Sequence, residues 1–138
     1  MRTKALRLCV AAVGLLIASL PLMAHHGAAE FESDPAKRVT LKGTVVEWIW
    51  ANPHCFLKFD VKDSSGNLVH WVAETSNPPD MINRGWSKQS LKAGDEVTVT
   101  VRPVKSGRPV GSVVQVMMAN GKILGIQGGG AAPGAGGN

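Results

Sequence analysis

The chain has 138 residues, of which 44% are hydrophobic and 18% are charged, and its formal net charge is +5 at pH 7. This length fits one small domain and excludes a large multidomain enzyme. The hydrophobic fraction is close to the globular average and only one long apolar run is present. The composition therefore also excludes a wholly disordered chain and a protein with several membrane spans.

The N-terminal segment has the pattern of a secretory signal peptide. Three basic residues precede the apolar stretch 8–20, and the segment ends in small residues at Ala24. This pattern predicts that residues 1–24 are a signal peptide of the Sec type, cleaved after Ala24. About 13 apolar residues are too few for a stable membrane span, which needs roughly 20. We therefore expect a periplasmic or secreted bacterial protein without a stable membrane span after processing.

Processing changes both the charge and the cysteine count. Three basic residues leave with the leader, so the mature net charge is only about +2. Without a clustered basic face, an exported protein of this charge is not expected to bind nucleic acid. Cys9 also leaves, and Cys55 is then the single cysteine of the mature chain. A buried, inert thiol is the simplest expectation, with a reactive thiol, pairing to another chain or metal binding as alternatives.

The mature chain divides into three parts by composition. Residues 25–37 are mostly polar and acidic and predict an exposed N-terminal arm. Residues 38–126 contain the apolar periodic segments of the folded domain. Residues 127–138 are rich in glycine, which is typical of a disordered tail.

The first half of the domain reads as three strands. Residues 38–50 are dense in β-branched and aromatic residues, and Gly43 in their middle favours a bulge or a sharp bend. Residues 55–62 alternate between apolar and polar side chains, and 68–73 return after the turn at 63–67. Both faces of the third segment are fairly apolar, so we expect it to be a central strand.

The second half reads as a short helix followed by two further strands. A capping residue and an early proline predict a helix over residues 80–84. Residues 96–103 and 112–118 predict strands, and a tight turn leads to a last extended segment at 122–126. Three strands, a short helical connection between strands 3 and 4, and two more strands is the order of an OB-fold. We therefore predict an all-β protein with a small five-stranded OB-fold-like barrel, and a sandwich is the alternative.

The histidines carry the main functional signal. Cleavage after Ala24 makes His25 the first residue, so its amine and its imidazole Nδ1 could chelate one ion together. Both groups lose their protons near neutral pH, and such nitrogen donors suit copper, zinc or nickel, with Cu(II) highest in affinity. His54 or His26 could add a third donor. Cys55 could add a sulfur only if strand alternation is broken at that point.

A simpler interpretation of the histidines stays open. His25 and His26 are then hydrophilic residues next to the cleavage site, and His54 is a histidine in a turn. His70 is a residue of the core or of a sheet face, with a role as metal ligand as a weaker alternative.

Aromatic residues near the same turn suggest a second kind of site. Trp48, Trp50, Phe56 and Trp71 could form a platform on an OB-fold that holds a peptide, a glycan or an envelope protein. In a small barrel, such side chains more often belong to the core. If a partner binds here, the candidate residues are the three tryptophans, Trp48, Trp50 and Trp71.

Enzyme chemistry has little support in the sequence. The serines lie in turns without a nucleophile elbow. Cys55 and His54 are adjacent, and neighbours on a strand point to opposite faces, so they do not form a catalytic pair. No complete catalytic signature is present, and we identify no catalytic residue; a redox accessory enzyme is the weakest of the alternatives.

Four short motifs occur together along the chain: AHHG at 24–27, LKGTVV at 41–46, NPH at 52–54 and LKAGDEV at 91–97. In this order the motifs resemble an uncharacterised family of small secreted bacterial proteins, domain of unknown function 6152. The resemblance covers most of residues 24–124 and leaves out the glycine-rich tail. It implies an exported domain in which the histidine start and the NPH turn go together, and it supplies no activity.

The sequence thus favours a periplasmic OB-like domain that binds a transition metal, with copper favoured, through His25, His26 and His54. Metal handling or sequestration is the expected role. The competing hypothesis is a metal-free adaptor that binds a peptide, glycan or envelope protein. The sequence leaves the oligomeric state open.

Overall fold

The computed structural model describes residue 27 and residues 30–126, so the predicted signal peptide and the predicted tail lie outside the described residues. Each predicted strand is present, with bounds that differ from the prediction by two residues or fewer. In chain order the elements are the 3₁₀ helix η2 (Pro35–Lys37), strands β1 (Val39–Ile49), β2 (Phe56–Lys62) and β3 (Leu68–Glu74), helix α2 (Pro78–Asn83), and strands β4 (Glu96–Pro103), β5 (Val110–Met118) and β6 (Ile123–Gly125).

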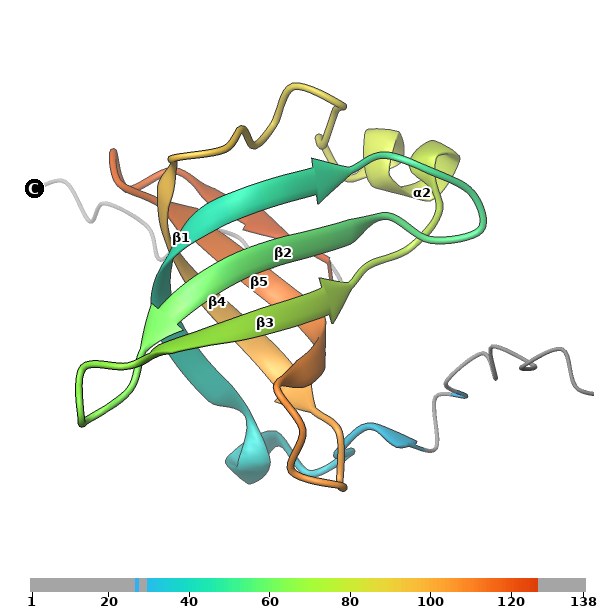
Figure 1. Ribbon diagram of the computed structural model, residues 1–138. Helices are drawn as coiled ribbons and strands as arrows, with labels where there is room; N and C mark the ends of the chain where they lie inside the picture. The colour runs from blue at the N-terminus through green and yellow to red at the C-terminus, as the bar shows by residue number, and fades with distance from the viewer. Residues whose placement is uncertain (1–26, 28–29, 127–138) are drawn as a thin grey trace, which may run out of the picture.

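The strands form a closed barrel (Figure 1). Antiparallel pairing runs in the order β3-β2-β1-β4-β5, and a parallel pairing between β3 and β5 closes the ring. One short helix, α2, connects β3 to β4, and the three-residue strand β6 pairs with β5. The five-stranded barrel predicted from the order of elements is therefore confirmed.

Alternating side chains from each strand fill the interior of the barrel. Leu57 and Phe59 of β2 are completely buried, and the three alternate valines of β4 at 97, 99 and 101 are buried as well. These inward positions agree with the period-two pattern of the sequence. Trp86, which follows α2, is the largest of the fully buried side chains, and its indole nitrogen donates to the Gly125 carbonyl at 3.1 Å.

Strand β1 is long and irregular. The sequence predicted a bulge or bend at Gly43, and the register shift lies slightly later, between Val45 and Glu47. Gly43 itself pairs with Val61 on β2 and with Val97 on β4. Gly43 and Thr44 are therefore the two positions at which β1 is paired on both sides.

Strand β3 is central over only part of its length. Its last three residues pair with β5, whereas its first four pair with β2 alone within the described structure. Leu68 at its start is 55% exposed. The expectation of a central strand thus holds for the end of β3 that closes the barrel.

The N-terminal arm, which the sequence predicts to be exposed, contains a buried residue. Phe31 is 3% exposed and forms a bridge with Val104, just beyond the end of β4. The Lys105 amide donates to the Glu30 carbonyl at 3.0 Å, and the Arg102 guanidinium lies 5.9 Å from the centre of the Phe31 ring. One aromatic residue in a polar segment gives no periodic signal, which is why the sequence did not predict this docking.

Candidate functional site

The connection between β1 and β2 is tied to the segment that follows β3. The Cys55 amide donates to the Ser76 carbonyl at 3.0 Å, and the Thr75 amide donates to the Cys55 carbonyl at 2.9 Å. The Thr75 hydroxyl adds a further bond to the Cys55 carbonyl at 3.2 Å. This end of the barrel therefore holds His54 on a fixed backbone.

The His54 ring is oriented by one hydrogen bond. Its Nδ1 lies 2.9 Å from the Thr75 carbonyl oxygen, and the side chain is half-buried. Because a carbonyl can only accept, Nδ1 carries the proton and Nε2 of the neutral ring carries the lone pair. Histidine ligands of metals in proteins commonly donate their other ring nitrogen to a carbonyl in this way. In His54, Nε2 is the ring nitrogen that this hydrogen bond leaves without a partner.

Cys55 lies on the other side of the chain. Its side chain is completely buried, and its Sγ is 3.8 Å from the Ala51 carbonyl oxygen. Strand alternation is therefore intact at this position, and the thiol packs in the barrel core as the simplest expectation had it. A metal ion bound by His54 from solvent would not contact it, so Cys55 is left out of the ligand set.

The other predicted metal ligands cannot be placed beside His54. His25 and His26 lie outside the described residues. Within residue 27 and residues 30–126, no group of three or more His, Cys, Asp or Glu side chains is arranged to hold a metal ion. Any site that includes His54 would need further ligands from outside this part of the chain.

His70 lies on the outer face of the barrel, away from the core. Its Nδ1 contacts the Asp60 carboxylate on β2 at 2.5 Å, and its side chain is 77% exposed. Of the two placements considered for His70, the sheet face is therefore the one found.

The three candidate tryptophans pack inward. The Trp48 ring lies 5.8 Å from the Trp50 ring and 5.4 Å from the Trp86 ring, and its indole nitrogen donates to the Ser87 carbonyl at 3.1 Å. Trp71 stacks on the buried Phe59, with 6.3 Å between ring centres. All three candidates are partly buried against the core.

Trp86 completes this aromatic group, and the sequence analysis did not include it. It lies outside any strand or helix, directly after Gly85, so hydrophobic periodicity gave no signal for it. Its burial beside Trp48 follows from the fold of the segment between α2 and β4.

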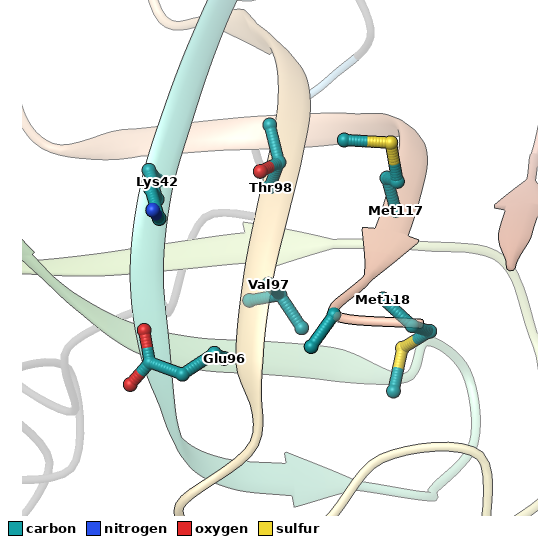
Figure 2. A pocket seen from close by; sticks show the side chains of 7 residues that line it. Lys42, Glu96, Val97, Thr98, Met117 and Met118 are labelled. Atoms are coloured by element: carbon teal, nitrogen blue, oxygen red, sulfur yellow. The ribbon is translucent and has the colours of Figure 1, made fainter. Parts of the chain in front are cut away.

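Two grooves lie on the outer face, where the sequence analysis identified no site. The larger has a volume of about 550 Å³ and is lined by residues of β1 and β2 together with Leu68 and Glu96. The smaller, about 310 Å³, is lined by residues of β1, β4 and β5 and by Ala119 (Figure 2). Lys42 and Glu96 line both grooves, so the grooves are adjacent.

The fold defines a small β-barrel protein of the OB-like type, with a candidate metal ligand at one end. Comparison with protein families is more specific: a family of unknown function (DUF6152) matches residues 12–114. The chain belongs to this family, the one that its sequence resembles. Neither a curated protein nor a solved structure matches it. Within the described residues, no helix is long and apolar enough to span a membrane.

Proposed function

We propose that the chain is exported to the periplasm, processed after Ala24, and binds a transition metal ion through its new N-terminus. The amine and imidazole of His25 chelate the ion, and Nε2 of His54 is the third donor, with His26 as the alternative. Copper is favoured by the nitrogen donors, and zinc and nickel are the other candidates. The role is metal handling or sequestration. The observation that carries this proposal is the bond from His54 Nδ1 to the Thr75 carbonyl, which leaves Nε2 as the donor atom.

The docked arm limits how far His25 can lie from the barrel. Phe31 is held against Val104, and about six residues separate it from His25. An extended segment of this length spans up to ~20 Å. His25 therefore lies within that distance of the anchored ring.

The distance from Phe31 to the site is similar. The path crosses three neighbouring strand positions, from Phe31 to Val104, to Val110 and to Val72, and then follows β3 for three residues to Thr75. With ~4.8 Å between strands and ~3.3 Å per residue, the straight distance from Phe31 to Thr75 is on the order of 15–20 Å. The His54 Nδ1 lies 2.9 Å from the carbonyl oxygen of Thr75. The reach of the arm supports His54 as a ligand of the same ion as His25.

The test replaces His54 in a protein that begins at His25. We expect His54→Ala to weaken Cu(II) binding at least about tenfold, because the ion loses one of three donors. A competition titration with a chromophoric copper chelator measures the affinity. The matched control is His70→Ala, because His70 is exposed and bound to Asp60, and this variant is expected to bind as the wild type does. Equal affinities for wild type and His54→Ala contradict the role of His54.

The adaptor hypothesis would use the three candidate tryptophans as its binding surface. Trp48, Trp50 and Trp71 are each partly buried against the core. The two adjacent grooves on the outer face, which are lined by charged and apolar side chains, are the better candidate for a macromolecular partner.

A further inference from the structure

A single row of side chains crosses the outer face of the barrel. Pairing across the strands places Lys62 opposite Leu68, Lys42 opposite Thr98, Thr98 opposite Met117, and Met117 opposite Ile123. Figure 2 shows Lys42, Thr98 and Met117 on three neighbouring strands. The row, called here the outer row, consists of Leu68, Lys62, Lys42, Thr98, Met117 and Ile123.

Lys62 and Lys42 are neighbours in the outer row. Gly43 and Val61 are the last pair at this end of the β1–β2 ladder, and the two lysines are the residues directly beyond that pair. Both line the larger groove. Like charges close together on neighbouring strands destabilise a sheet. Neither ammonium group forms an ion pair or a hydrogen bond with any described residue.

The carboxylates in the same groove already have partners. Asp60 is bound to His70, and Glu96 accepts a hydrogen bond from the Thr44 hydroxyl at 2.7 Å. The larger groove is therefore lined by two unpaired lysines and by two carboxylates that already have partners. This arrangement repels a uniformly charged polyanion and fits a ligand whose carboxylates are separated by neutral groups.

Apolar side chains lie at both ends of the outer row. Leu68 is 55% exposed at one end, and Met117 and Ile123 are 39% and 51% exposed at the other. The row crosses five strand spacings of ~4.8 Å each, or about the length of seven extended residues. A short peptide with apolar ends and an acidic centre matches this order of side chains.

We propose that the outer row binds an extended acidic peptide segment of a partner protein. Two carboxylates of the peptide pair with Lys42 and Lys62, while apolar side chains at its two ends contact Leu68 and the Met117–Ile123 pair. The proposal does not depend on a metal ion, because none of its residues belongs to the candidate metal site.

The test uses a labelled synthetic peptide, Leu-Ser-Glu-Ser-Glu-Ser-Leu, and the same peptide with glutamine at both glutamates. Fluorescence anisotropy gives the affinities in metal-free buffer, and two-dimensional amide NMR maps the contact surface. We expect saturable binding of the glutamate peptide with shifts at the outer row. The glutamine peptide and the protein variant Lys42→Gln/Lys62→Gln are each expected to bind at least about tenfold more weakly, because the two charge pairs are lost.

The control is Lys88→Gln/Lys92→Gln, which removes the same charge from two exposed positions between α2 and β4 and is expected to bind within about twofold of wild type. The outer-row variant should also be at least as stable to urea as wild type, because it removes a like-charge pair. Absence of binding at 1 mM peptide, equal affinity of the two peptides, or unchanged binding by the outer-row variant overturns the proposal. Tighter binding of polyphosphate than of the peptide overturns it as well.

Discussion

At the scale of single residues, Gly43 has the closest surroundings of the described glycines. A Cβ atom there would overlap the backbone carbonyl oxygen of Asp60 and would lie 3.1 Å from the Phe59 ring. The carbonyl belongs to a paired strand and cannot rotate away as a flexible side chain could. Glycine is therefore required at this position for close approach of β1 and β2.

We expect Gly43→Ala to destabilise the fold by about 1–3 kcal/mol, because the added methyl forces the two strands apart. The urea midpoint of unfolding measures this change. Gly125→Ala is the matched control, since a Cβ there meets nothing within 4 Å; it should change the stability by less than about 0.5 kcal/mol. Similar midpoints for wild type and Gly43→Ala would mean that the strands tolerate the methyl.

Single residues also mark the limit of what the sequence predicted about the site. Cys55 is buried, as the general tendency of free cysteines led us to expect, and its position agrees with the alternation of 55–62. The orientation of His54 depends on Thr75, which lies 21 positions away in the chain. A contact of this kind arises from the pairing of β2 with β3, and no local pattern reveals it.

At the scale of elements, the residues of its first turn determine where helix α2 begins. The Asn77 side chain accepts a bond from the Asp80 amide at 3.0 Å, and prolines occupy the first two helical positions. The sequence predicted this helix two residues too late, because it placed the prolines before the helix. Asp80 also accepts a bond from Arg84 Nε at 3.0 Å, one turn further along.

The charge of Asp80 makes the stability of α2 dependent on pH. The hydrogen bond from Arg84, aided by Ser76, holds the pKa of the Asp80 carboxyl below its ordinary value of 3.8. A carboxyl whose pKa is lowered on folding stabilises the folded state fully above its unfolded pKa, and this contribution is lost as the pH falls through the folded pKa. Asp80→Asn should therefore lower the urea midpoint at pH 7 and have a smaller effect at pH 3.

The comparison is made by urea unfolding at both pH values, with Arg84→Gln as the reference background. In that background Asp80→Asn should cost less at pH 7, because the partner of the carboxylate is already gone. An effect of Asp80→Asn that is the same at pH 7 and pH 3 would assign it to helix propensity and not to charge.

At the scale of the whole molecule, the barrel is closed by contacts that the order of elements alone does not specify. The sequence predicted five strands and the helical connection, because each segment has its own period and turn residues. It did not predict that Phe31 docks beside Val104, or that β3 meets β5 over three residues only. Both features depend on which strand edges remain free after the antiparallel pairs have formed.

The proposed metal site combines parts of the chain that are far apart in the sequence. Phe31 fixes the arm on the barrel, and His54 is oriented by Thr75 at a distance that the residues before Phe31 can span. A free amine at His25 is then the decisive chemical requirement, since it supplies one of the proposed donors.

The most direct measurement is the copper and zinc content of protein exported and processed in a bacterial host, determined by elemental mass spectrometry. Intact mass must first establish that the chain begins at His25. We predict about one tightly held copper ion per chain, lost in His25→Ala and in a chain with one extra alanine before His25, because both remove the amine–imidazole chelate. A correctly processed chain that retains no metal and binds none at micromolar concentration would contradict the proposed function.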